Sequence, residues 1–393
     1  MQNFTYFSPT KVIFGQDAVM NTVEEIKQWN GSRIFVVYGG GSVVKSGLLS
    51  TITDSLEKAN LPYEVLGGVK PNPLLSLAKE GVKRALAFNA DFILAVGGGS
   101  VIDTAKGIAH GVANPEKDIW DFWLMKEPVT KSLPVGCVLT ISAAGSETSN
   151  SSVLTNDETG SKRGLSTDFN RPKFSIMDPV LTYTLPKYHL TCGIVDIMMH
   201  TMDRYFTHST GNELTDVFAE ALLRTVIKNG SIAYANQEDY QAMSELMWCG
   251  SISHNGLTGL GAVTDFAPHQ LGHELSGKFD VAHGASLSTI WKHWALYAYQ
   301  ENTARFARFA KEVWGIEKEN NVDAALAGIQ ATADYFRSID MPTNFTELGI
   351  GIQSEEVLAD LADRASFYGT RLVGNFKKLT KEDNYQIYKS ANI

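Results

Sequence analysis

Two short apolar segments of the chain each end in three glycines and a serine. Residues 33–38 run into Gly39–Ser42, and residues 92–96 run into Gly97–Ser100. Both segments are rich in β-branched or other large apolar side chains without polar alternation, which is typical of strands buried on both faces. Each is followed by apolar residues at helical spacing. This order predicts strand–turn–helix units that build a parallel, doubly wound sheet.

Further segments extend this alternation over the first half of the chain. We expect further strands at 63–66, 135–141 and 174–177, helices at 48–59, 74–88 and 101–112, and a hairpin of 151–155 with 161–166. After about residue 181 helical periodicity takes over, with helices expected at 212–227, 239–257, 268–277, 283–298, 303–314, 322–339 and 354–365. The sequence therefore predicts an α/β domain over residues 1–180 and an all-helical domain over residues 181–393.

Composition excludes several classes of protein. The 393 residues are 44% apolar and 20% charged, enough for two or three domains with a substantial core. The net charge is −9 and no dense Lys/Arg run is present, so we expect no nucleic-acid partner. Cys137, Cys192 and Cys249 are too far apart for a CxxC motif, and their odd number does not indicate a disulfide framework. Without a signal-peptide pattern or a long apolar run, we expect a cytoplasmic protein with no membrane partner.

The glycine turns let backbone N–H groups approach an anionic ligand such as a pyrophosphate. Ser100 is expected to cap the following helix, together with Asp103. A tight turn that binds no ligand explains one such motif equally well. The turn at Gly39–Ser42 holds no Asp or Glu to accept from a ribose 2′-OH, and Ser42 and Lys45 can donate to a 2′-phosphate. This favours NADP over NAD. The alternative is that the glycines are there only because the turn needs a positive φ.

Histidines and one aspartate recur at helical spacing in the second half of the chain. Asp196 and His200 are four residues apart in an apolar segment, so both face one side if that segment is helical. An ionised carboxylate there is costly unless it is paired or bound to a metal. His269 and His273 form a second such pair, and His283 follows ten residues later. An oxygen and nitrogen set without thiolates suits Fe²⁺, Zn²⁺, Mn²⁺ or Co²⁺. The alternative is a buried helix pair with core histidines that bind no metal.

Taken together, these motifs resemble the iron-containing (group III) alcohol dehydrogenases, and within them the NADPH-dependent butanol dehydrogenase and aldehyde reductase branch. The matching segments are Tyr38–Ser42, Lys70–Pro73, Gly97–Asp103, Gly145–Glu147, Asp178-Pro179, Gly193–Asp196 with His200, and His269, His273 and His283-Gly284. The resemblance implies a Rossmann-like domain beside a helical one, the plan that dehydroquinate synthase shares, with the active site in the cleft between them.

The resemblance also implies site residues and an assembly. One divalent metal, Fe²⁺ or Zn²⁺, would be held by Asp196, His200, His269 and His283. His273 lies outside this set, and is either a proton relay or positioning group or a core histidine held by a backbone group. The family commonly forms dimers, so we expect a homodimer. The cofactor, NADP(H) in preference to NAD, would contact Gly39, Gly40, Gly41, Ser42, Gly97, Gly98, Gly99, Ser100, Asp103, Thr140, Ser146, Lys162, Leu181 and Thr182.

The predicted activity is reversible hydride transfer between NADP(H) and a primary alcohol and its aldehyde. A lyase is the second hypothesis, because sugar-phosphate cyclases related to dehydroquinate synthase share the two-domain plan. They need basic residues beside the metal, and only Lys278 is basic between His269 and His283. A third hypothesis is an inert metal-binding or nucleotide-binding protein, against which the complete ligand set argues. The sequence leaves the physiological substrate open.

Overall fold

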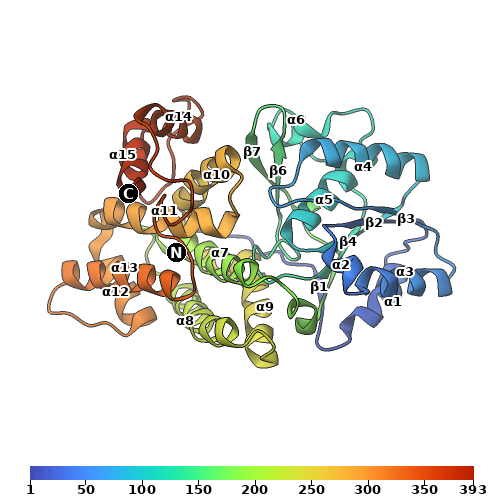
Figure 1. The fold of residues 1–393 in the computed structure, drawn as a ribbon, viewed down its shortest axis with the longest axis horizontal. Coiled ribbons are helices and arrows are strands. Elements are labelled where there is room, and N and C mark those ends of the chain that lie inside the picture. The colour runs from blue at the N-terminus through green and yellow to red at the C-terminus, as the bar shows by residue number, and fades with distance from the viewer. The chain divides into compact units, whose positions relative to one another are not determined.

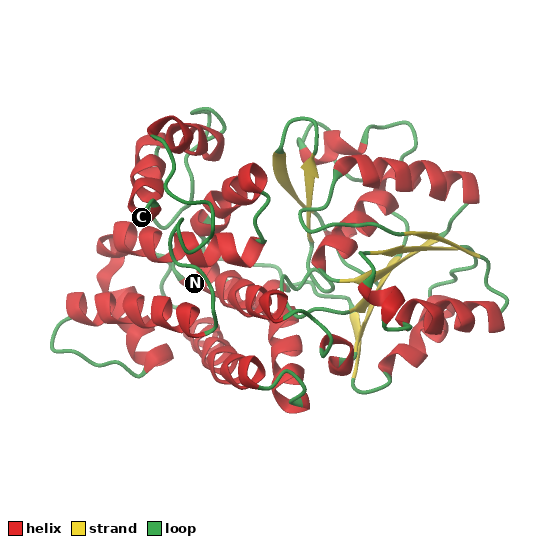
Figure 2. Ribbon diagram, viewed as in Figure 1, coloured by secondary structure: helices red, strands yellow, loops and turns green.

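The computed structural model describes all 393 residues, which form two compact units (Figure 1). The α/β unit comprises Phe7–Leu185, and the helical unit comprises Met1–Tyr6 together with Pro186–Ile393. All named strands lie in the α/β unit, and the helical unit is built from helices and loops (Figure 2). This confirms the predicted fold class, and a division into two domains after residue 180 stays a prediction.

A six-stranded parallel sheet forms the centre of the α/β unit. Its strands are β1 (Lys11–Phe14), β2 (Ile34–Tyr38), β3 (Tyr63–Leu66), β4 (Phe92–Gly97), β5 (Val135–Leu139) and β8 (Phe174–Met177). Their order is β1-β8-β5-β4-β2-β3, and every neighbouring pair is parallel. The chain passes from β2 to β3 on one side and then to β4 on the other. The winding therefore reverses between β2 and β4, where loops at the carboxyl ends of the strands diverge.

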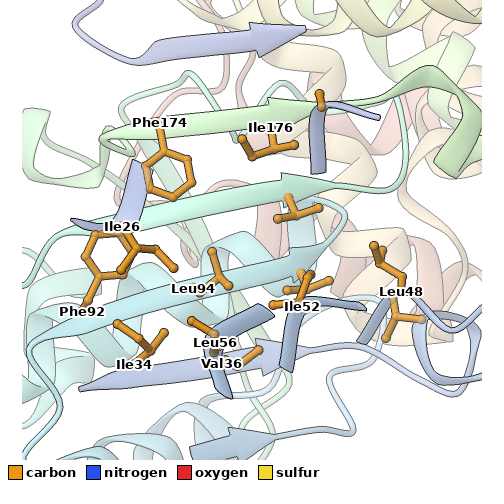
Figure 3. Packing of buried hydrophobic residues seen from close by; sticks show 14 residues of the cluster. Ile26, Ile34, Val36, Leu48, Ile52, Leu56, Phe92, Leu94, Phe174 and Ile176 are labelled. Carbon is orange, nitrogen blue, oxygen red and sulfur yellow. The ribbon is translucent and has the colours of Figure 1, made fainter. Parts of the chain in front are cut away.

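Helices cover both faces of this sheet, and a separate antiparallel hairpin follows β5. These elements are α1 (Thr22–Gln28), α2 (Ser42–Lys45), α3 (Leu48–Lys58), α4 (Leu75–Phe88), α5 (Gly99–Ala113), α6 (Ile119–Trp123), β6 (Ser151–Asn156) and β7 (Ser161–Ser166). On one face Val36 and Leu94 pack against side chains of α1 and α3, such as Ile26 and Ile52 (Figure 3). α4 and α5 lie on the opposite face (Figure 1). Burial on both faces explains the continuous apolar runs of the strands.

The sequence prediction missed four short elements of this unit, namely β1, α1, α2 and α6. β1 has only four residues and lies at an edge of the sheet, where its ends are exposed. Such a strand shows neither a long apolar run nor a clear alternation, so its pattern is weak. α1, α2 and α6 are seven, four and five residues long, too short for a helical period to stand out.

The helical unit is organised around α7. Its helices are α7 (Lys187–Tyr205), α8 (Glu213–Ala235), α9 (Tyr240–His254), α10 (Ala267–Phe279), α11 (His283–Ala298), α12 (Thr303–Trp314), α13 (Asn321–Ser338), α14 (Glu355–Ala365) and α15 (Lys381–Ala391). Sixteen of the nineteen residues of α7 are buried, and α8, α9, α10 and α11 all pack against it. A helix that is buried all round belongs at the centre of its unit.

Short 3₁₀ turns join several of these elements. They are η1 (Ala18–Asn21), η2 (Asp168–Asn170), η3 (Pro179–Thr182), η4 (Leu257–Gly259) and η5 (Tyr299–Asn302). None of the helices is both long enough and apolar enough to cross a bilayer. The cytoplasmic location stays a prediction.

Candidate active site

Asp196 and His200 stand one turn apart on α7, as their spacing predicts. His200 Nε2 lies 3.4 Å from Asp196 Oδ1, and both side chains are buried. Burial lowers the pKa of His200 well below its ordinary value, and the nearby His254 and His269 lower it further. His200 is therefore a neutral imidazole, the form that can donate a lone pair to a metal.

Helices α10 and α11 bring two more imidazoles to the same carboxylate oxygen. Nε2 of His269 lies 3.7 Å from Asp196 Oδ1, and Nε2 of His283 lies 3.8 Å from it. The ligand atoms of Asp196, His200 and His269 all lie within 4.8 Å of one another. Donor atoms around a tetrahedral cation with bonds of about 2.1 Å are about 3.4 Å apart. The spacing therefore fits one divalent ion after small shifts.

Unsatisfied polar atoms mark the same place. Asp196 Oδ1 and His269 Nε2 are buried and have no hydrogen-bond partner. Buried polar atoms without partners are rare, because burial removes the water that would otherwise bind them. A divalent cation would satisfy both atoms at once. The donor set of one carboxylate and three imidazoles suits Zn²⁺ or Fe²⁺, so the residues present fit the predicted metal.

A glycine sets how closely α11 approaches α7. Gly284 follows His283 in the first turn of α11, and a Cβ atom there would lie 2.2 Å from the carbonyl oxygen of Cys192. Cys192 belongs to α7 and precedes Asp196 by one helical turn. A backbone atom cannot turn aside as a side chain can. Glycine at this position therefore permits the close approach that brings His283 next to Asp196.

Two further histidines flank the cluster. The ring centroid of His273 lies 5.1 Å from that of His283 and 6.3 Å from that of His269. His254, at the end of α9, lies against His200 with the ring centroids 3.9 Å apart and the ring planes tilted by 41°. Sequence reasoning did not single out His254, because no polar partner in its own segment marks it. The role of His273 in catalysis stays a prediction.

Asp203 is a second residue that the sequence analysis missed. Its Oδ2 atom lies 2.5 Å from Nδ1 of His269, on the side of the ring that faces away from Asp196. One signal was present in the sequence, because Asp196, His200 and Asp203 follow the spacing i, i+4, i+7 of a single helical face. The partner on α10 was not predictable, since it depends on how the two helices pack.

The two glycine turns lie next to each other at the carboxyl edge of the sheet. Tyr38 pairs with Val96, so the turns that follow these strands begin side by side. A Cβ at Gly97 would lie 2.5 Å from Val101, and one at Gly98 would lie 2.0 Å from Ile141. These two glycines are needed for packing, whether or not a ligand binds.

Gly40 differs from its neighbours in the first glycine turn, Gly39–Ser42. Its φ is not positive, and a Cβ there would meet nothing within 4 Å. Neither packing nor backbone conformation therefore demands glycine at this position. A remaining reason for glycine at position 40 is that it lets a ligand approach the backbone closely.

The predicted cap of α5 is wrong. The helix begins at Gly99 with Gly98 as its N-cap residue, and no side chain caps it. Asp103 instead faces the loop after β5 and strand β6, where its carboxylate accepts from Ser146 Oγ at 2.6 Å and from the Val153 N–H at 2.8 Å. The sequence could not reveal these partners, because they lie 43 and 50 residues further along the chain.

The other predicted cofactor residues occupy several places in the α/β unit. The Thr140 N–H donates to the Gly97 carbonyl at 3.2 Å, beside the second glycine turn. Lys162 lies on β7, where its buried Nζ donates to Asn72 Oδ1 at 3.0 Å. Leu181 and Thr182 lie in η3, after the last strand of the sheet. For all of the predicted residues, contact with a cofactor stays a prediction.

Comparison with known proteins identifies the family. The sequence profile of the iron-containing alcohol dehydrogenases matches residues 9–179, and the profile of the C-terminal part of the same family matches residues 191–392. The chain belongs to the iron-containing alcohol dehydrogenase family. This confirms the resemblance drawn from the motifs, and it makes the protein an oxidoreductase of the alcohol dehydrogenase class.

Individual relatives match over the full length of the chain. NADH-dependent butanol dehydrogenase A of Clostridium acetobutylicum is 40% identical and covers 100% of both chains. The NADPH-dependent aldehyde reductase YqhD of Escherichia coli is 33% identical, also over 100% of both chains. The crystal structure of NADH-dependent butanol dehydrogenase A from Thermotoga maritima superposes with a TM-score of 0.96 at 36% identity, covering 100% of this chain and 99% of that one.

Proposed function

We propose that this protein is a metal-dependent alcohol dehydrogenase and aldehyde reductase that interconverts primary alcohols and aldehydes with NADP(H). The observation that carries the proposal is the buried Asp196 Oδ1 atom, which three imidazole nitrogens face at 3.4–3.8 Å. Membership of an alcohol dehydrogenase family supports the reaction type. The names of full-length relatives, a butanol dehydrogenase and an aldehyde reductase, support the substrate class.

In this proposal Asp196, His200, His269 and His283 hold Fe²⁺ or Zn²⁺. The bound ion would supply Lewis-acid polarisation of the substrate oxygen, and the nicotinamide would supply the hydride chemistry. The task of the chain is to hold the four side chains in position and to exclude water from them. Burial of Asp196, His200 and His269 serves both purposes.

We assign His273 to proton transfer or substrate positioning rather than to metal binding. Its ring lies next to His283 and is partly exposed, so it can reach both the site and solvent. An imidazole exchanges protons near neutral pH, which suits a step that protonates an alkoxide. The substitution His273→Ala should lower kcat and change its pH profile while the metal content of the protein stays unchanged.

NADP(H) is proposed because the turn after β2 lacks the acidic residue that would accept from a ribose 2′-OH. Lys45 is exposed, and its side chain runs past Gly41 in this turn. The names of the relatives divide between the coenzymes, with NADH at 40% identity and NADPH at 33%. The composition of the turn is therefore what carries the choice.

The coenzyme choice is tested by comparing kcat/KM for NADPH and NADH. The substitution Lys45→Ala should lower kcat/KM for NADPH by about tenfold, the worth of one hydrogen bond to a charged group, and leave NADH unaffected. A wild-type enzyme that prefers NADH would overturn this part of the proposal.

A homodimer is proposed on the family's habit and on one edge of the sheet. β1 is an edge strand, and Phe7 before it and Phe14 at its end are 50% and 42% exposed. Exposed aromatic groups next to an unpaired strand edge favour association with a second chain. Sedimentation equilibrium should give twice the mass of the chain, and a monomer would contradict the proposal.

The activity is tested by following NADPH oxidation over a panel of linear aldehydes, before and after chelation. We expect turnover to disappear with the metal and to return when Fe²⁺ or Zn²⁺ is added. Turnover by metal-free protein would overturn the metal-dependent scheme. A lyase would oxidise no NADPH in net turnover, and the structure disfavours it because Lys278 is paired with Asp360 at 2.6 Å.

A further inference from the structure

Asp203 occupies the same face of α7 as two of the proposed metal ligands. Asp196, His200 and Asp203 lie at positions i, i+4 and i+7, so their side chains leave the helix in nearly the same direction. The Asp203 side chain is fully buried. A carboxylate in such a place is costly unless a hydrogen-bond donor or a positive charge meets it.

The group that meets Asp203 is His269. Asp203 Oδ2 lies 2.5 Å from Nδ1 of His269, while Nε2 of the same ring points towards Asp196 Oδ1. An ionised carboxylate can only accept, so Nδ1 must carry the proton of this hydrogen bond. In the neutral imidazole Nε2 is then left with its lone pair, which is the form a metal ligand needs.

A backbone hydrogen bond of Asp203 also holds the segment at the start of α10. The Asp203 carbonyl accepts from the Asp265 N–H at 2.8 Å. The carboxylate of Asp265 in turn accepts from the backbone N–H groups of Ala267, Asn375 and Phe376 at 2.6–3.1 Å. These bonds hold the segment that precedes His269. They do not touch its ring, which packs beside Phe266 and His200 and whose Nδ1 is hydrogen-bonded to Asp203.

We propose that Asp203 is a positioning residue of the metal centre, which holds the His269 ring with Nδ1 protonated and Nε2 directed at the cation. The proposal rests on the proposed function, because it requires Asp196, His200, His269 and His283 to hold a divalent ion. Loss of such a partner behind a histidine ligand typically weakens metal binding about 10–100-fold. The same loss is expected here.

The test is a titration of metal-free full-length protein with Co²⁺, whose visible absorption reports the geometry of its ligands. Asp203→Leu removes the acceptor, and we expect the Kd for Co²⁺ to rise about 100-fold with a changed absorption band. Asp203→Asn keeps an acceptor oxygen without its charge, and should recover part of the affinity. This partial recovery separates orientation of the ring from a general loss of packing.

A matched control is available on α8. Asp216 is also a buried carboxylate, and Arg305 binds it through two hydrogen bonds of 2.5 and 2.6 Å. Asp216→Asn makes the same chemical change at a similarly buried group that touches no proposed ligand. We expect it to lower the thermal unfolding temperature but to leave the Co²⁺ affinity and spectrum of the protein unchanged.

The outcomes distinguish this inference from the proposed function. If wild-type protein binds no Co²⁺, or if Asp196→Ala binds it as tightly, the metal centre itself is disproved. If wild-type protein binds Co²⁺ and both Asp203 variants stay within roughly twofold of its Kd with the same spectrum, the role of Asp203 is disproved. If Asp203→Leu does not fold, the comparison of Asp203→Asn with Asp216→Asn decides.

Discussion

Helices α5 and α7 each carry two ionisable side chains one turn apart that are buried or nearly so, yet the two pairs differ in what surrounds them. Lys106 of α5 is fully buried, and its Nζ donates to the Ser146 carbonyl, to Ser146 Oγ and to the Ser151 carbonyl at 2.7–2.8 Å. Both carboxylate oxygens of Asp103 accept hydrogen bonds as well. On α7, Asp196 Oδ1 has imidazoles around it but no hydrogen-bond donor.

The difference separates a structural pair from a binding site. In α5 every charged atom has a partner within the protein, so the pair fastens the helix to the loop that follows β5. In α7 the unsatisfied oxygen and the nitrogens around it still need a positive partner. Two charged residues at helical spacing therefore do not by themselves show whether they bind a ligand. The number of hydrogen-bond partners that the fold supplies to them is more informative.

The largest effect is expected from Asp196→Ala. Loss of Lewis-acid stabilisation, worth several kcal/mol, should lower turnover by about 10³-fold or more, and the bound metal should be lost. Without metal the free energy of unfolding should stay within about 1 kcal/mol of wild type, because the buried Oδ1 atom of Asp196 has no hydrogen bond to lose. Activity, metal content and urea unfolding check this. A loss of several kcal/mol in the metal-free protein would show that Asp196 is a satisfied structural group.

Lys106→Met should produce the opposite result. It leaves the half-buried Asp103 carboxylate without the cation 4.0 Å away, and it leaves the Ser146 and Ser151 carbonyls without their donor. Removing one partner of a buried charged group costs about 3–5 kcal/mol. Urea unfolding should show this loss, while the Co²⁺ affinity of the folded variant stays unchanged. Lys79→Met is the control, because Lys79 pairs with Asp118 on the surface and such pairs contribute about 1 kcal/mol or less. Equal losses of unfolding free energy in Lys106→Met and Lys79→Met would contradict the structural role of Lys106.

His110 extends the contrast to pH. It lies on α5 with both ring nitrogens bonded, to Ser132 Oγ and Asn170 Oδ1, and burial lowers its pKa to about 4. The unfolded chain binds this proton at a higher pH than the folded chain. Stability that is present above about pH 6.5 is therefore lost as the pH falls towards 4, by about 3 kcal/mol. The free energy of unfolding of His110→Gln should therefore fall less between pH 6.5 and pH 4 than that of wild type. The same pH dependence in both proteins would refute this.

Gly284→Ala should have the smallest effect. The added Cβ would meet the Cys192 backbone, so α11 must move away from α7 at the cost of about 1–3 kcal/mol. His283 moves with it, and we expect the Co²⁺ affinity to fall by about tenfold. Gly328→Ala is the control, because its Cβ would press on Ala310, between α13 and α12. We expect both substitutions to lower the free energy of unfolding by a similar amount, but only Gly284→Ala to weaken Co²⁺ binding. This result would support the role of the close approach between α11 and α7.

Much of the fold was predictable from local pattern. The strands at Ile34–Tyr38 and Phe92–Gly97 and the helix at His283–Ala298 follow from apolar runs, glycine turns and helical period. These signals are local, because side-chain burial repeats with the period of the element itself. β1 and α6 were missed for the same reason, since four or five residues are too few to show a period.

The site was predictable only in part. The spacing of Asp196 and His200 is sufficient to place both on one helical face. Asp203 and His254 were missed, because the group that each one contacts lies on a different element of the fold or far along the chain. The expected cap at Ser100 was wrong because Asp103 finds better partners in a distant loop.

The sequence by itself therefore determined which residues can act as metal ligands, which segments become strands and helices, and which side chains share a face. Only the tertiary structure decided that α7, α10 and α11 pack closely enough for one carboxylate oxygen to meet three imidazoles. It also decided which buried charges find a partner within the protein. The physical reason is that periodicity acts over a few residues, whereas hydrogen bonding and packing join residues that are distant in the chain.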